Sequence, residues 1–160
     1  MKILATLPAH SRVWVYTSNR EFTETEVKRI IELGVEFANS WKVHGEDLNA
    51  GFEVVYNRFL VFGVDEVVAG ASGCSIDSSV RLMTTIEKEF NAVLLDKLNL
   101  AFHGSQNTIE VLPMFEFQKE MDNGGIHSET IVFNNLVETV GELNSSWEIP
   151  LKASWHKQLL

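Results

Sequence analysis

The sequence predicts an α+β protein, with a ferredoxin-like layered core of order β-α-β-β-α-β and a C-terminal extension of helix and strand. Two long segments carry apolar residues at spacings of three and four, which predicts helices. Shorter segments rich in β-branched and aromatic residues lie around them and end in turn residues, as is typical of strands. We therefore expect two helices on one face of a sheet.

The length of the chain favours a single domain. A chain of 160 residues, 45% of them hydrophobic, forms an apolar core without disulfides or metals. We expect the core to span about residues 10–112 and the extension, about 113–160, to pack on it.

The first predicted elements are a strand and a helix. Val13–Tyr16 reads as the strand. Thr23 and Glu26 form a capping-box pattern, which predicts the start of a helix that continues to about residue 42. Ile31 belongs to its apolar stripe, and Gly34 is expected to weaken the helix slightly.

Residues 52–64 leave two alternatives open. Asn57-Arg58 is either a two-residue turn between two strands or a bulge in one long strand. We favour the long strand, because the second turn position lacks the glycine that a positive φ favours. Its second half is apolar on both faces, as expected of a central strand.

A hairpin turn at Asp65-Glu66 and a strand over 67–72 are expected next. Ser75 is the predicted N-cap of a helix whose apolar residues run from Ile76 to Leu94. Two further strands are predicted over 98–103 and 108–112.

The extension begins with Pro113 and a predicted helix over 114–121. A strand over 130–133 and a short helix over about 136–143 follow. The tail is expected to be pinned by the indoles of Trp147 and Trp155.

Charge and composition exclude several classes of function. The chain has 13 Lys and Arg against 22 Asp and Glu, so its net charge of -9 disfavours nucleic acid and anionic lipid as partners. Its longest apolar run, residues 59–64, is too short to cross a bilayer. The single cysteine, Cys74, favours a reducing compartment, and we expect a cytoplasmic location.

The segment of small residues before the second long helix is the most suggestive candidate site. A helix N-terminus holds anions and lowers the pKa of a thiol. The candidate ligand-binding residues are Ser72, Gly73, Cys74 and Ser75. Cys74 is a candidate nucleophile, and His44 and His103 are the candidate bases. We favour the structural interpretation, in which the small residues make a turn and Ser75 caps the helix.

No metal or cofactor is predicted. The five histidines show no paired ligand spacing, and one cysteine cannot build a structural zinc site. A P-loop requires Gly-Lys-Ser/Thr, and the chain contains no Gly-Lys dipeptide, so it is not predicted to be a P-loop ATPase.

Two stretches resemble a family of small uncharacterised bacterial proteins. They are Tyr56–Val80, with Tyr-Asn-Arg-Phe-Leu-Val and Ala-Gly-Ala-Ser-Gly-Cys-Ser-Ile-Asp-Ser-Ser-Val, and the tail, with Thr130–Val137 and Ser154-Trp155-His156. Members often carry the label "ABC transporter ATPase". The missing phosphate-binding loop argues against that activity here.

A weaker resemblance concerns the second half of GYF-like modules, which are associated with protein interaction. It rests on Gly125-Ile126, Thr130, Val132-Phe133 and Trp147. The tyrosine-glycine-proline opening of those modules has no counterpart near Val111–Pro113.

We therefore expect a cytoplasmic, non-catalytic binding or interaction domain for a protein partner, a second copy or a small ligand. The alternative is a small enzyme that uses Cys74 at a helix N-terminus.

Overall fold

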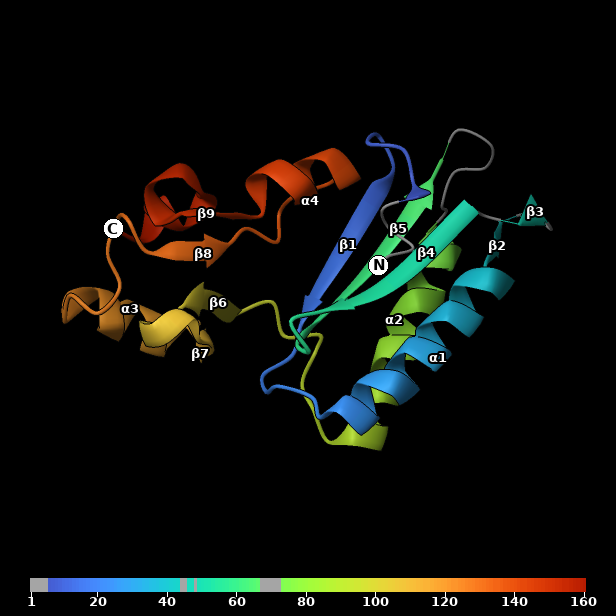
Figure 1. Cartoon of the computed structure of the whole chain (residues 1–160), viewed down its shortest axis with the longest axis horizontal. Coiled ribbons are helices and arrows are strands. Elements are labelled where there is room, and N and C mark those ends of the chain that lie inside the picture. Colours follow the sequence, from blue (N-terminus) through green and yellow to red (C-terminus); the bar gives the residue numbers. More distant parts are fainter. Residues whose placement is uncertain (1–5, 44–45, 48, 67–72) are drawn as a thin grey trace.

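The computed structural model describes residues 6–43, 46–47, 49–66 and 73–160, and it confirms the α+β class (Figure 1). One sheet has the order β1-β5-β4 and a second has the order β7-β6-β8-β9. The strands are β1 (Arg12–Thr17), β2 (Lys42–Val43), β3 (Glu46–Asp47), β4 (Asn49–Val55), β5 (Phe59–Asp65), β6 (Asn99–His103), β7 (Ile109–Pro113), β8 (Ile131–Phe133) and β9 (Glu148–Pro150). The α-helices are α1 (Glu24–Ser40), α2 (Gly73–Phe90), α3 (Met114–Asp122) and α4 (Val140–Ser146). Short 3-10 helices cover Ser105–Asn107, Leu151–Ala153 and Trp155–Leu159.

The first sheet is buried on both faces. Alternate residues of β5 point to opposite sides, so Leu60 and Phe62 pack against α1 and α2, whereas Phe59 and Val61 pack against the second sheet. The prediction that residues 59–64 form a central strand covered on both sides is therefore confirmed.

The second sheet is also covered on both faces. Ala101 and Phe133 face the first sheet, and Phe102 and Val132 face α3 and the C-terminal 3-10 helices. The described chain thus stacks in four layers: α1 with α2, the first sheet, the second sheet, and α3 with the tail (Figure 1).

The ferredoxin-like layering is not confirmed. The first sheet and its two helices follow the order β-α-β-β-α, with both helices on one face. The next strand, β6, does not join this sheet but pairs with β7 and β8 in the second sheet. Element order alone does not determine which strands pair, so the sequence did not predict two sheets.

Helix α1 begins as predicted, because Thr23 and Glu26 form the full capping box. Two details differ. Ile31 is 38% exposed and does not belong to the core stripe. Gly34 is buried, and it permits close contact with the ring of Phe52.

The preference for one long strand over 52–64 is wrong. Tyr56 and Asn57 have φ values of 54° and 53°, and Arg58 N–H donates to the Val55 carbonyl at 3.1 Å. This turn joins β4 and β5 as an antiparallel hairpin in which Val55 pairs with Phe59. The left-handed residues sit one position earlier than the expected turn, and Tyr and Asn replace the glycine that the sequence argument required.

Three helix boundaries also need correction. Ser75 is not an N-cap, since α2 begins at Gly73. The helix ends before Leu94, because Asn91 takes a left-handed φ of 50°. Helix α4 begins later than predicted, because Thr139 caps it by accepting from Glu142 N–H at 3.1 Å.

The remaining predictions have mixed outcomes. The strands over 98–103, 108–112 and 130–133 and the helix over 114–121 are confirmed. The predicted strand over 67–72 lies outside the described residues. Trp147 is buried, and Trp155 packs on the apolar residues that lie between the second sheet and α3.

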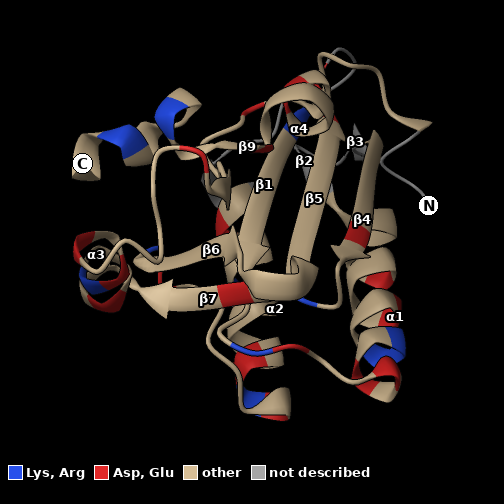
Figure 2. Ribbon diagram, turned by 60° about the vertical axis from the view of Figure 1, so that its left-hand side comes forward, with Lys and Arg blue, Asp and Glu red and all other residues tan. Residues whose placement is uncertain are grey.

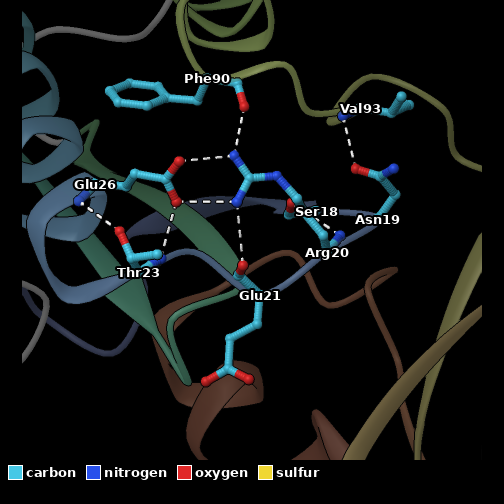
Figure 3. A network of polar contacts seen from close by, with 8 residues as sticks. All are labelled: Ser18, Asn19, Arg20, Glu21, Thr23, Glu26, Phe90 and Val93. Carbon is cyan, nitrogen blue, oxygen red and sulfur yellow. Dashed lines mark hydrogen bonds and ion pairs between the residues drawn. The ribbon is translucent and has the colours of Figure 1, made fainter.

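Arg20 lies between the segment that follows β1, the start of α1 and the end of α2 (Figure 3). Its guanidinium forms two hydrogen bonds to Glu26, at 2.8 and 2.9 Å, and donates to the carbonyls of Glu21 and Phe90. Asn19 nearby accepts from Val93 N–H at 2.8 Å. The start of α1 and the end of α2 are therefore tied to the segment that follows β1.

None of the helices in the described part of the chain has the length and apolar character that crossing a membrane requires.

Candidate functional site

Three polar side chains from separate elements meet where the two sheets face each other. The carboxylate of Glu148 accepts from Tyr56 Oη at 2.9 Å and from His103 Nε2 at 2.8 Å. A carboxylate only accepts, so the Nε2 atom of His103 carries a proton. We call these three residues the Glu148 cluster.

Tyr56 lies in the hairpin turn between β4 and β5. Its left-handed backbone is unusual for a bulky residue and costs on the order of 1 kcal/mol. The turn is held because Phe22 N–H donates to the Asn57 carbonyl at 2.8 Å and Ser18 N–H to the Arg58 carbonyl at 2.9 Å. This anchored turn directs the phenol from the first sheet onto the second.

Glu148 is the first residue of β9 and pairs with Phe133 of β8. The residue before it, Trp147, is fixed because its indole donates to Asn135 Oδ1 at 2.9 Å. The Asn135 amide in turn donates to Thr17 Oγ1 of β1 at 2.7 Å. These two bonds hold the start of β9 against the first sheet.

Aromatic rings form the base of the cluster. The imidazole of His103 stacks on Phe133, with centroids 5.1 Å apart and planes 19° apart. The ring of Tyr56 stacks on Trp147 at 6.3 Å and 24°. Phe133 and Trp147 are buried, whereas Tyr56 is 48% exposed, so the cluster opens to solvent on the tyrosine side.

The electrostatics keep Tyr56 protonated. Partial burial raises the pKa of the Tyr56 phenol, and the hydrogen bond to Glu148 and its negative charge raise it further. Among the described residues, no Lys or Arg forms an ion pair with Glu148, and its charged partner is His103 when that imidazole is protonated. The cluster can therefore accept a cation, since its carboxylate carries charge that neutral donors do not balance.

The structure brings one predicted site residue, His103, into this cluster. His44 and Ser72 lie outside the described residues. The backbone of Gly73, Cys74 and Ser75 forms the first turn of α2, and their side chains lie outside the described part.

Sequence reasoning missed Tyr56 and Glu148 as site residues. They lie 92 positions apart, and Glu148 is 45 positions from His103, so no local motif joins them. The signal that could have suggested Tyr56 is the turn itself, which we interpreted as a strand.

A shallow hollow lies away from the cluster, along the outward side of α1. Its described lining residues are Ile31, Glu32, Val35, Glu36, Asn39 and Ser40. In the described residues, no group of three His, Cys, Asp or Glu side chains is arranged to hold a metal ion. The Glu148 cluster is the stronger candidate for a polar site, because its groups converge from three elements.

No family model, no curated protein and no solved structure matches this chain.

Proposed function

We propose that this protein is a non-catalytic binding module of the cytoplasm and that the Glu148 cluster binds a positively charged ammonium or guanidinium group. That group belongs to a small ligand or to a side chain of a partner protein.

The observation that carries the proposal is the partly buried carboxylate of Glu148, whose side chain is 32% exposed. Some of the other described carboxylates form ion pairs with a Lys or Arg, as Glu26 does with Arg20 and Glu129 with Lys152. Glu148 instead lies between a phenol and an imidazole. A bound cation would supply the missing countercharge.

The neighbouring groups suit the same ligand. The exposed face of Tyr56 attracts a cation through its ring electrons. The net charge of -9 raises the local concentration of cations around the protein.

The non-catalytic part of the proposal rests on how the protons are held. Tyr56 has a raised pKa, and His103 commits its Nε2 proton to Glu148. The phenol thus resists the ionisation that would make it a base near neutral pH.

The test titrates the full chain with methylguanidinium and methylammonium chloride and follows backbone amide shifts by NMR. We expect the shifts to centre on Tyr56, His103 and Glu148, and Glu148→Gln to weaken binding at least tenfold because it removes the charge and keeps the shape. Glu129→Gln is the matched control, since it removes an exposed carboxylate elsewhere and should leave binding unchanged.

Equal affinity of Glu148→Gln and wild type for both cations would contradict the proposal. Tyr56→Phe separates the contributions, because it keeps the carboxylate and the ring and removes the phenol donor. It should fold and bind more weakly than wild type but more tightly than Glu148→Gln.

A further inference from the structure

We infer that the Glu148 cluster selects a primary ammonium group over a guanidinium group, and that Tyr56 is the residue that determines this selectivity. The inference rests on the proposed cation site and narrows it from two classes of cation to one. Its evidence is the way in which two donors already occupy the oxygens of the Glu148 carboxylate.

Tyr56 occupies the position in front of the carboxylate. Its Oη atom lies 2.9 Å from Oε2 and 3.1 Å from Oε1 of Glu148, so the phenol faces both oxygens almost equally. A donor that is nearly equidistant from the two oxygens of one carboxylate lies between them, at the open end of the group. A guanidinium uses this same end when its two parallel N–H groups form a bidentate pair with a carboxylate. The phenol therefore lies where a guanidinium binds best.

His103 occupies an outer position of the same carboxylate. Its Nε2 atom lies 2.8 Å from Oε1 of Glu148. An ionised carboxylate offers about four acceptor positions, two on each oxygen. The phenol covers the two positions at the open end, and the imidazole takes the outer position of Oε1. Of the positions that these described donors leave, the outer one of Oε2 is available to a ligand.

A single position on one oxygen favours an ammonium group. An ammonium is a compact charge with three donors, and it can donate one N–H to Oε2 while its other donors stay in water. A guanidinium at the same position would form one hydrogen bond and lose the bidentate geometry that makes its pairs with carboxylates strong.

A ligand can reach this position from solvent. The side chain of Glu148 is 32% exposed, and Tyr56 is 48% exposed. The ring of Tyr56 stacks on Trp147 with one face, and its exposed part can contact the same cation.

The strands that carry His103 and Glu148 do not supply a competing cation. Strands β6 and β9 contain no Lys or Arg, as Figure 2 shows. The ammonium group that the cluster selects therefore comes from a ligand, which is either a free amine or a lysine side chain of a partner protein.

The test compares matched pairs of cations at pH 8, above the ordinary histidine pKa of about 6.5. The full chain is titrated with methylammonium and methylguanidinium, and with the methylamides of acetylated lysine and acetylated arginine, and amide shifts are followed by NMR. We expect the ammonium member of each pair to bind about tenfold more tightly, because the guanidinium loses one of its two charged hydrogen bonds. Tighter binding of the lysine derivative than of methylammonium assigns the site to a protein side chain, and the reverse order assigns it to a free amine.

Tyr56→Phe tests the position of the phenol. The variant keeps the ring and opens the end of the carboxylate, so the ratio of ammonium to guanidinium affinity should fall about fivefold. His103→Phe is the matched variant, because it also removes one donor from Glu148 and keeps a ring that can stack on Phe133. The phenol still covers the open end in His103→Phe, so the two affinities should change together and keep their ratio.

The outcomes separate this inference from the cation site itself. If wild type binds the guanidinium members equally or more tightly, the selectivity is wrong and the cation site stands. An unchanged ratio in Tyr56→Phe would remove the role of Tyr56. Equal binding of methylammonium and tetramethylammonium, which has no N–H donor, would show that charge alone is recognised and would also overturn the inference. Absence of binding by all of these cations would overturn both the inference and the proposed function.

Discussion

Gly34 shows how much a single position can depend on a distant partner. The apolar spacing of α1 predicted its buried side, yet the glycine itself read as a weak point. In the structure a Cβ atom at position 34 would lie 2.1 Å from Cδ1 of Phe52, which is 18 positions away in the chain. No local pattern contains this contact, so the need for glycine could not be predicted from the helix alone.

Gly34→Ala should therefore destabilise the protein, although alanine is the better helix former. The added methyl group has to displace a fully buried ring, and overpacking of this kind costs about 1–3 kcal/mol. Urea unfolding would measure the loss. Asn39→Ala, at an exposed position of the same helix, should change stability by less than about 0.5 kcal/mol, and a neutral Gly34→Ala would contradict the packing argument.

His103 illustrates the same limit for the candidate site. Its residue type and position at a strand end made it a candidate, and the structure places it in the Glu148 cluster. Its partners are contributed by a turn and a strand far away in sequence, so one member of the cluster could be predicted and the arrangement could not.

Elements whose signals are local were predicted well. Thr23 and Glu26 are three positions apart, and the helix begins there. The β4–β5 turn was missed because Tyr56 adopts a conformation that its own type disfavours. The fixed turn around it, rather than the propensity of Tyr56, determines this element.

The Arg20–Glu26 contact at the start of α1 should make the stability of the fold depend on pH in the acid range. Arg20 and the Thr23 N–H lower the pKa of Glu26 to about 2, from an ordinary value of 4.5. A carboxyl with a lowered pKa in the folded state stabilises the fold above about pH 4.5, and this stability is lost as the pH falls toward 2. Urea midpoints at pH 7 and pH 3 should thus differ more in wild type than in Glu26→Gln.

At pH 7 the same variant should be about 1 kcal/mol less stable, because it loses the charged bond at the helix start. Glu32→Gln is the control: its contact with Arg29 is exposed, and its removal should barely change either midpoint. If the urea midpoint of Glu26→Gln falls between pH 7 and pH 3 as much as that of wild type, other carboxyl groups determine the loss of stability in acid.

At the scale of the whole molecule, the sequence predicted the class and most of the elements but not the layers. The continuous apolar run over 59–64 correctly indicated a strand covered on both faces. It did not indicate what covers each face, since either a pair of helices or a second sheet can bury an apolar face of a strand. The second sheet therefore could not be predicted from periodicity.

His156, in the layer formed by α3 and the tail, should make the stability of the whole fold depend on pH. Its ring is buried between Phe117 and Trp155, and Nδ1 lies 2.7 Å from Ser154 Oγ. Burial lowers the pKa of His156 to about 4, from an ordinary value of 6.5. The unfolded chain therefore takes up this proton first, and stability should fall as the pH decreases from about 6.5 to about 4.

The loss should reach about 3 kcal/mol over that range. Chemical unfolding at pH 7 and pH 4.5 would measure it, with His156→Gln as the comparison. The variant should be less stable at pH 7 but should lose less between the two pH values. Identical pH dependence in the two proteins would show that His156 titrates normally in the folded state.

The two-sided burial of β5 also constrains when the chain can fold during synthesis. Residues 98–160 supply the layer that covers Phe59 and Val61. Once residues up to about 95 have emerged from the ribosome, both long helices and the first sheet are available. One face of that sheet then still has nothing to pack against. The nascent chain must keep this face from aggregating until residues 98–160 have emerged.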